Sequence, residues 1–474
     1  MKNLILFAII FISSCTVGPD YEAPVFFDNE EIKKSIGIQG DEEKKDLAGL
    51  FSPYDFKDET LNTLMDKVQE NSPSIKSAIL RLKQARESLK ITSKNSFPIF
   101  DLSGKYNFVN ESNNMAALFN SDYYEAGVDM SWEIDIFGSN RRKTEASKAL
   151  FMAQLYNLKY TNVSLVSEIA VNYINLRNAE ELLKDAKENL QIQQEAYEII
   201  LDQYKVALTD EITVSQAKYL VETTKMLIPE LEYQKEMYAN ALAVLVGELP
   251  NALDEMLDKN TDNLVAKLFE YDVEKLYSLP ISVVRNRPDV KMAEENLIAQ
   301  NAEVGVAIAS LYPSFSLSGF LGIQSSKWSN LAEKDSVTNS LIPSLNLPLF
   351  HWGNLRSNVR LQKYMKEEML LNLEMTLLNA VNEVKNTIIA IEKEYQINKS
   401  AVEAYENMQL VSELNWKKYT LGLVAFSDVL DAEQRRLSAQ TDMVNSNAKL
   451  YRNLVAFYKA IGGKPIYEKE EKTL

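Results

Sequence analysis

The chain has 474 residues, a formal net charge of −16, and only one His and one Cys. The single histidine, His351, excludes His-based triads and His-rich zinc sites, and no phosphate-binding glycine loop is present. A negative charge of this size argues against a nucleic-acid partner. We therefore expect no catalysis, no cofactor and no metal site. An enzyme built on paired carboxylates stays a weak alternative, because 67 acidic residues make chance pairs certain.

The N-terminus resembles a bacterial lipoprotein signal. A short positive start precedes an apolar run at residues 4–12, far shorter than the ~20 residues of a membrane-spanning helix. Cys15 stands where a lipobox places its acylated residue, and the Thr16 that follows it, by resemblance to bacterial lipoproteins, favours the outer membrane. We expect removal of residues 1–14 and a lipidated N-terminal segment at residues 15–72. The alternative is an ordinary signal peptide with an incidental cysteine.

The rest of the chain contains an internal two-fold repeat. Pro73 begins PSIKSAILRLKQ, and Pro288 begins PDVKMAEENLIA at an offset of 215 residues (288 − 73 = 215). A repeat of this length predicts one architectural unit built twice around a pseudo-symmetry axis, which favours a duct or scaffold over one asymmetric cleft. The same offset relates Gly138 to Gly353, Tyr204 to Tyr419, Ala217 to Ala432 and Gly247 to Gly462. The expected boundaries are residues 73–247 for repeat 1, 248–287 for an equatorial inter-repeat segment, 288–463 for repeat 2 and 464–474 for a charged tail.

Two segments of each repeat alternate with a period of two residues. In the clearest segment, apolar residues from Tyr124 to Ile136 alternate with polar residues from Glu125 to Asp135. This pattern is typical of a transmembrane barrel strand, and the alternative is a soluble antiparallel sheet with one wet face. Pro343 and Pro348 weaken the prediction for the last strand. The expected strands cover residues 99–109, 123–137, 314–324 and 340–350.

Four strands cannot close a membrane barrel, because the smallest barrels have eight. An open sheet edge in lipid leaves backbone groups without hydrogen bonds. If these strands span a membrane, several subunits must therefore share one barrel. The polar face of the strands would line its lumen and, being acidic, would favour cations. The acids expected there are Asp101, Glu125, Asp129, Glu133 and Asp135.

Long helical segments separate the strand pairs. From Arg141 to Ile228 there is no Gly or Pro, and apolar or small residues recur every three or four positions, which predicts coiled-coil packing. A helix of about 66 residues would be roughly 100 Å long, more than three bilayer cores, and must project away from the membrane. The expected helices cover residues 139–206, 211–246, 353–421 and 427–461.

Several of these segments resemble lipidated outer-membrane efflux factors of the TolC-like superfamily. The resemblance covers nearly the whole mature chain, and it implies a homotrimer with four strands per chain in a shared 12-stranded β-barrel. The barrel would continue into a coiled-coil periplasmic tunnel that docks on an adaptor protein linked to an inner-membrane pump. The fold class is thus an α+β membrane protein, anchored among outer-membrane lipids. The matching segments are Cys15-Thr16-Val17-Gly18-Pro19-Asp20-Tyr21, Trp132 to Gly138 with Arg141 and Arg142, Arg287-Pro288-Asp289 with Ala293, Glu294, Gly305, Ala307 and Tyr312-Pro313-Ser314, and Leu347 to Phe350 with Gly353 and Arg356.

The resemblance also assigns roles at the helix tips. Acids at the positions of Asp428 and Asp431 line the narrow periplasmic mouth in the family; the alternative is ordinary acids at a helix start, with Ser427 as cap. Ala207 replaces the usual Gly, so the first turn is expected to differ in detail. The adaptor-contacting residues implied are Val206, Ala207, Leu208, Thr209, Leu421, Gly422, Leu423 and Val424. Val424 and Thr213 replace the Arg and Asp of some members, so a lock between those two side chains is absent.

We therefore predict a passive exit duct of a tripartite pump that exports drugs or other small toxic compounds. Ducts for secreted proteins or metal ions are alternatives with the same architecture, although the scattered methionines do not support copper or silver export. A structural coiled-coil lipoprotein that never spans the membrane is an alternative of another class.

Overall fold

The structure, a computed structural model, describes residues 16–38, 51–108, 122–259, 264–265, 276–277 and 280–463. Cys15, the tail at 464–474 and parts of the expected equatorial segment lie outside the described residues. The chain divides into two compact units, which are described separately. The first unit comprises Met1–Pro24, Arg81–Leu155 and Met292–Met375, and the second comprises Val25–Leu80, Tyr156–Lys291 and Thr376–Leu474.

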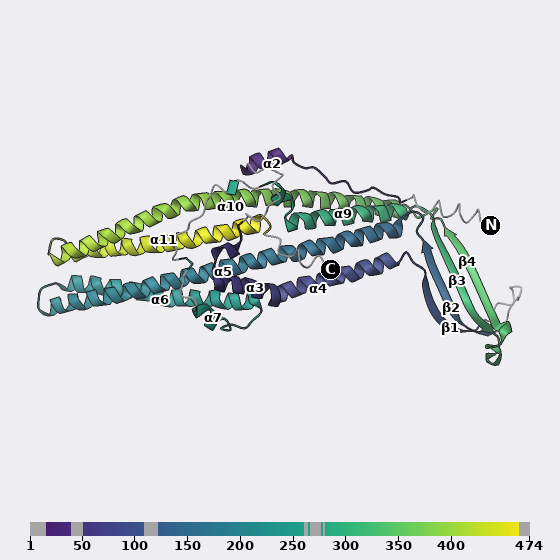
Figure 1. The fold of residues 1–474 in the computed structure, drawn as a ribbon, viewed down its shortest axis with the longest axis horizontal. Helices are drawn as coiled ribbons and strands as arrows, with labels where there is room; N and C mark the ends of the chain where they lie inside the picture. Colours follow the sequence, from purple (N-terminus) through teal and green to yellow (C-terminus); the bar gives the residue numbers. More distant parts are fainter. Residues whose placement is uncertain are drawn as a thin grey trace. The chain divides into compact units, whose positions relative to one another are not determined.

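The first unit contains one antiparallel sheet of four strands in the order β1-β2-β3-β4 (Figure 1). The chain order therefore equals the spatial order, and the β2–β3 pair joins the two sequence repeats. Gly127 lies opposite Gly322 in this pair, and Asp129 lies opposite Phe320. The strands are β1 (Ile99–Asn107), β2 (Tyr123–Ile134), β3 (Ser314–Ser325) and β4 (Val337–Asn346).

All four strands differ in extent from the sequence-based expectation, β2 and β4 by the most residues. β2 ends at Ile134 because the chain turns there toward a helix, and the Asp135 carboxylate accepts a hydrogen bond from the Arg141 backbone N–H at 2.9 Å. β4 covers Val337–Asn346 and not residues 340–350, so it begins and ends earlier than expected; it includes Pro343, while Pro348 lies beyond its end. β4 is an edge strand of this sheet, a position that tolerates the missing N–H of proline.

Long helices make up most of the rest of the chain. In the second unit, the α5–α6 and α10–α11 hairpins lie side by side (Figure 1), and α11 contacts α6. α11 begins one residue before Ser427 with Ala425 as its N-cap residue, so Ser427 lies in the first turn and is not the cap. The principal helices are α4 (Pro73–Lys94), α5 (Ser139–Lys205), α6 (Glu211–Val246), α9 (Pro288–Ala309), α10 (Asn354–Thr420) and α11 (Phe426–Ala460).

Shorter helices complete the second unit. α3 (Glu59–Asn71) buries Leu61, Leu64, Met65 and Val68 completely, and α2 (Asn29–Ile36) buries Ile32 and Ile36. α7 (Asp254–Asp258), α8 (Ser282–Arg285) and the 3₁₀ turn η2 (Pro53–Phe56) also belong to this unit, whereas η4 (Trp328–Asn330) and η5 (Lys334–Ser336) follow β3. Among the described residues, no helix combines the length and apolar character needed to cross a membrane.

Candidate functional site: a polar strand face and two apolar helix tips

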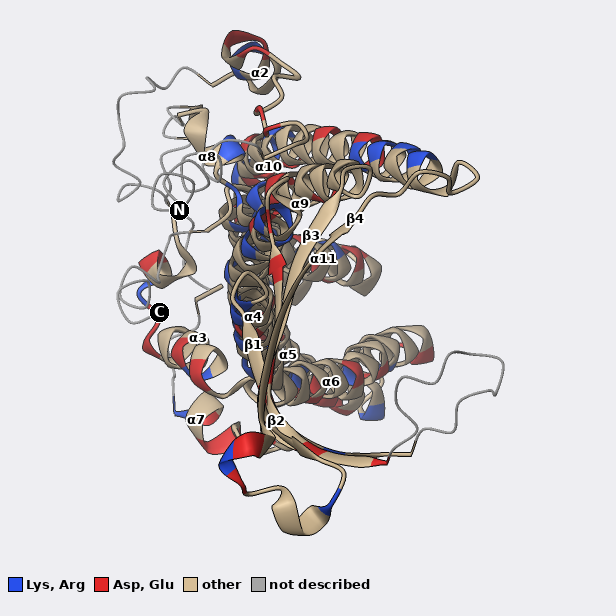
Figure 2. Ribbon diagram, turned by 90° about the vertical axis from the view of Figure 1, so that its right-hand side faces the viewer, with Lys and Arg blue, Asp and Glu red and all other residues tan. Residues whose placement is uncertain are grey.

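Four of the five acids expected in a lumen share one face of the sheet. Asp101 is paired with Asp129 in the register, and Glu125 and Glu133 lie four residues to either side of Asp129 on β2. Lys105 on β1 lies on the same face, 3.7 Å from Glu125 and 4.0 Å from Asp129. This face is therefore acidic but partly neutralised. All its charges come from β1 and β2, because β3 and β4 contain no charged residue (Figure 2).

The fifth expected acid, Asp135, does not belong to this face. It lies beyond the end of β2, and its carboxylate accepts from the backbone and side-chain nitrogens of Arg141. Asp135 therefore stabilises the turn from strand to helix. The period-two pattern continues to Ile136, two residues beyond the strand, which is why the sequence placed Asp135 in it.

Phe320 is a residue of the polar face that the sequence reasoning missed. A Cβ built on Gly127 would lie 2.7 Å from Phe320 Cζ, and a Cβ built on Gly322 would lie 2.6 Å from the same atom. The ring therefore covers two facing glycines, one from each repeat. The sequence offered one indication of this contact: Gly127 and Gly322 lie inside predicted strands, and glycine in a strand often marks a site where another group approaches the backbone closely.

The two helix tips have the same backbone geometry. Gly422 N–H donates to Tyr419 O and Leu423 N–H donates to Lys418 O, both at 2.9 Å, which is a Schellman-type ending with Gly422 at φ 69°. Ala207 takes the left-handed conformation too, at φ 60°. Its turn has the equivalent bonds, Ala207 N–H to Tyr204 O at 3.0 Å and Leu208 N–H to Gln203 O at 2.9 Å. The difference expected from alanine at this position does not occur.

Large apolar side chains are exposed at both tips. Val206 is 65% and Leu208 77% exposed at the first tip, and Leu421 is 72% and Leu423 69% exposed at the second. Ala207 and Gly422 are exposed, while Thr209 and Val424 are half-buried. Nothing in the described part of the chain covers these four large side chains, so the tips present an apolar surface to any partner.

An aromatic cluster supports the tips from beneath. Phe426 and Val429 at the start of α11 pack with Ile200 of α5 and Ala217 of α6. The Tyr419 ring lies 5.4 Å from that of Phe426, and burial raises the pKa of the Tyr419 hydroxyl, which also bonds Thr209. The second tip is therefore held against the first by packing.

The two acids expected at the mouth have local partners. Asp428 accepts from the Ala425 backbone N–H at 3.1 Å, which satisfies a free donor at the start of α11. Asp431 pairs with Arg435 one turn later at 3.0 Å, with both side chains exposed. The helix-start role left open by the sequence is thus present for Asp428, and it is compatible with a further role in an assembly.

A buried polar network joins the two hairpins, farther from the tips than the aromatic cluster. Glu433 of α11 is 8% exposed and accepts from Ser412, from Trp416 Nε1 at 3.2 Å and from Arg436 Nε at 3.0 Å. Arg436 also donates to Asn189 Oδ1 of α5 at 2.7 Å. The cost of removing such charges from water offsets much of their attraction, so the pair is weak evidence for added stability. The sequence analysis did not identify this network.

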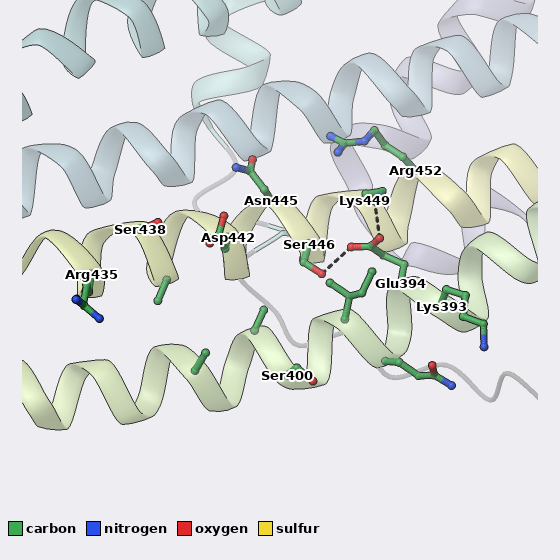
Figure 3. Close-up of a pocket in the computed structure, with 15 residues that line it drawn as sticks. Lys393, Glu394, Ser400, Arg435, Ser438, Asp442, Asn445, Ser446, Lys449 and Arg452 are labelled. Carbon is green, nitrogen blue, oxygen red and sulfur yellow. Dashed lines mark hydrogen bonds and ion pairs between the residues drawn. The ribbon is translucent and has the colours of Figure 1, made fainter.

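A groove of about 960 Å³ lies between α10 and α11 (Figure 3). At its base the buried Glu394 accepts from Ser446 at 2.8 Å and pairs with Lys449 at 2.7 Å. Apolar side chains, among them Ile397, Ala401 and Ala404, line much of the groove, together with the charged residues Lys393, Arg435 and Asp442. Among the described residues, no group of three or more His, Cys, Asp or Glu side chains is placed to hold a metal ion.

The chain belongs to the outer membrane efflux protein family, whose model matches residues 64–248 and 279–463. It is similar to the cation efflux system protein CusC of Escherichia coli O6:H1, with 25% identity over 95% of this chain and 96% of that protein. It is similar to the solvent efflux pump outer membrane protein SrpC of Pseudomonas putida, with 25% identity over 98% of each chain. The solved CmeC outer membrane channel of Campylobacter jejuni matches with a TM-score of 0.84 and 28% identity over 97% of each chain. The chain is therefore an outer-membrane efflux protein, as the sequence predicted, and not a coiled-coil lipoprotein that stays outside the membrane.

Proposed function

We propose that this protein is a passive exit duct whose strands form a shared barrel in the outer membrane and whose helices form a periplasmic tunnel. One observation carries the proposal: in a chain of this family, a four-stranded sheet has an apolar face, a polar face and two edges without partners. β1 pairs only with β2 and β4 only with β3 within the described chain. Because open edges are not stable in lipid, β1 of one copy pairs with β4 of the next. Three copies give a barrel of twelve strands, the number that the family resemblance implies.

The α6 helix supports assembly from several copies. Ile212, Tyr219, Met226 and Tyr233 recur at intervals of seven residues, and each is more than half exposed. A coiled-coil seam has apolar residues at two positions of each heptad; this row fills one of them and would form half of such a seam against a facing helix. The seam is uncovered within the described chain, so a helix of a neighbouring copy is its natural partner.

The cargo is proposed as drugs or other small toxic compounds, delivered by an inner-membrane pump through a periplasmic adaptor. The relatives described above are named for cations and for solvents, so proteins similar to this chain are named for different cargo. A duct with a broad polar lumen is consistent with selection by the pump. Acylation of Cys15 is part of the same proposal, and it rests on the lipobox pattern.

The adaptor is proposed to dock on the exposed apolar tips. We expect the double variant Leu208→Asp with Leu423→Asp to remain in the membrane but to lose adaptor crosslinking and resistance, because charges replace the contact surface. Leu249→Asp is the matched control, because Leu249 is 81% exposed and lies outside both tips. Crosslinking of the double variant at wild-type yield would rule out this docking site.

Asp428 and Asp431 are proposed to form acidic rings at the mouth when three copies assemble. Like charges held close attract cations. Single-channel recordings test this: Asp431→Ala should weaken block by a divalent cation applied on the periplasmic side, and Asp428→Ala should add to the effect. Asp202→Ala, an exposed acid paired with Lys205, is the control. Unchanged block in the Asp428 and Asp431 double variant would leave both as ordinary helix-start acids.

A further inference from the structure

The first described residues of the chain lie against the junction between β2 and α5. Val17 N–H donates to Phe137 O at 3.1 Å. A Cβ built on Gly138 would lie 2.7 Å from Thr16 Cγ2 and 2.9 Å from Thr16 Cα. The glycine at this junction therefore allows Thr16 to approach the backbone closely, in addition to its left-handed φ of 84°.

Arg142, in the first turn of α5, binds this segment from within the first unit. It is 4% exposed, and its Nε donates to Val17 O at 3.3 Å. Its Nη2 donates to Gly18 O at 3.2 Å and to Asp20 Oδ1 at 2.7 Å, and its Nη1 donates to Glu145 at 2.7 Å. A planar fork with five donors can make these bonds together, whereas a lysine ammonium cannot reach the same set.

The α9 helix completes the binding site for the segment. Asn301, fully buried, donates from Nδ2 to Pro19 O at 3.0 Å. A Cβ built on Gly18 would lie 2.5 Å from Gly305 Cα, and one on Gly305 would lie 2.9 Å from Arg142 Cγ. Two glycines therefore allow the segment and α9 to touch backbone to backbone beneath the arginine side chain. We call this arrangement of Arg142, Asn301, Gly138 and Gly305 around residues 16–21 the N-terminal clasp.

The second repeat shows that the clasp is not a general requirement of the junction. Gly353, the equivalent of Gly138, has φ 81° and would place a Cβ with nothing within 4 Å. Ser357 stands at the position equivalent to Arg142. The left-handed turn favours glycine at both junctions, whereas the close approach and the buried arginine occur only where the start of the chain is bound.

We propose that Arg142 is a positioning residue that fixes the lipidated start of the chain to the base of the membrane strands. This inference rests on the proposed acylation, because Cys15 directly precedes Thr16 and an acyl group on it would be attached one residue from the clasp. The acyl chain and the sheet then enter the membrane as one body. Without the clasp, the acyl group anchors the protein through a loose tether that does not orient the strands.

Spin-label mobility tests the clasp in the full-length protein in membranes. A label is placed at exposed Glu22 through Glu22→Cys, while palmitate incorporation reports acylation of Cys15 independently. Arg142→Ala should abolish the immobile component of the label's spectrum and lower the membrane-inserted fraction, with palmitate incorporation unchanged. Asp20→Asn, which leaves the arginine in place and alters a side chain that is 91% exposed, should reduce the immobile component without endangering folding.

Arg141→Ala is the matched control, because Arg141 bonds only to Asp135 and to the carbonyl of Ile136 in the described chain. It should leave the label immobile, because no bond of its side chain reaches residues 16–21 in the described chain. An immobile label in both Arg142→Ala and Asp20→Asn would overturn the clasp. A mobile label with a wild-type inserted fraction would overturn its role in orienting the strands. Absent palmitate in the wild-type protein would refute the acylation alone, since label mobility still reports on the clasp.

Discussion

The two repeats of this chain have equivalent helix ends and turns but differ in many side chains. In each repeat, the glycine after the last helix packs against the proline that begins the first helix: a Cβ on Gly247 would lie 3.0 Å from Pro73 Cδ, and one on Gly462 would lie 2.9 Å from Pro288 Cδ. The helix of each half thus ends against the proline at which that half begins. This shows that the repeat specifies helix ends and turns at a few glycine and proline positions, and leaves the other positions free to diverge.

Several differences between the halves occur where a function is proposed. Charges lie on β1 and β2 but not on β3 and β4, so the polar face is asymmetric across each sheet. The N-terminal clasp occurs at the first junction only. The equivalent of Asp185 in α5 is Ser400 in α10. Exchanging such positions tests which differences matter.

The largest effect is expected where the two halves meet in the sheet. A Cβ on Gly127 would lie 2.6 Å from both Gly322 Cα and Leu321 O, so Gly127→Ala must push the β2 and β3 backbones apart. We expect loss of most membrane-inserted protein, measured by heat-modifiable migration in gels. Gly104→Ala in β1 is the control, because its Cβ would meet nothing closer than Glu125 O at 4.0 Å. Normal insertion of the Gly127→Ala protein would mean that β2 and β3 tolerate a wider separation of their backbones.

Local patterns in the sequence predicted the elements well but predicted long-range contacts poorly. Alternation over residues 123–137 and the positions of Gly247 and Gly462 depend on near neighbours, so strands and hairpins could be expected from them. The hydrogen bonds of Arg142 to residues 17–20 join segments more than a hundred positions apart, and no periodicity encodes them. The Phe320 ring over two glycines depends likewise on a strand register that only pairing defines.

A smaller effect is expected from replacing Asp185 by the serine of the second half. Burial, helped by the negative charges of Glu181 and Glu188 and opposed by Lys184, raises the pKa of the Asp185 carboxyl to about 6. Its unfolded pKa is about 3.9, so the folded state holds the proton between these values and stability falls as the pH rises through this window. Asp185→Ser should therefore raise the melting temperature by a few degrees at pH 7.5 and leave it nearly unchanged at pH 4.

The control for this prediction is an acid on the same helix whose side chain is 74% exposed. Asp202 pairs with Lys205 at 2.8 Å near the tip, so Asp202→Ser should not raise the melting temperature at pH 7.5. Gln440 of α11 bonds the Asp185 side chain and also accepts from Arg436, so the packing at this position must be monitored by circular dichroism. Equal shifts for Asp185→Ser at both pH values would show that the gain comes from packing and not from the carboxyl charge.

The smallest effect is expected at the tips, where the two halves adopt one turn with different residues. Alanine in the left-handed conformation costs about 1–2 kcal/mol relative to its ordinary conformation. Glycine loses more freedom on folding, by roughly 0.5–1 kcal/mol, which offsets part of that cost. The net preference for glycine is therefore about 0.5 kcal/mol. Ala207→Gly should slow amide hydrogen exchange at the first tip, and Gly422→Ala should speed it at the second, each by roughly twofold.

Hydrogen exchange on peptides spanning each tip measures both rates. In the double variant Ala207→Gly with Gly422→Ala, the first tip should exchange at the rate of the wild-type second tip, and the second tip at the rate of the wild-type first tip. Gly422→Ala could instead alter the backbone conformation of the second turn, although the first turn accommodates Ala207. That result would mean that the aromatic cluster at Phe426, and not the turn residue, sets the geometry of the tip.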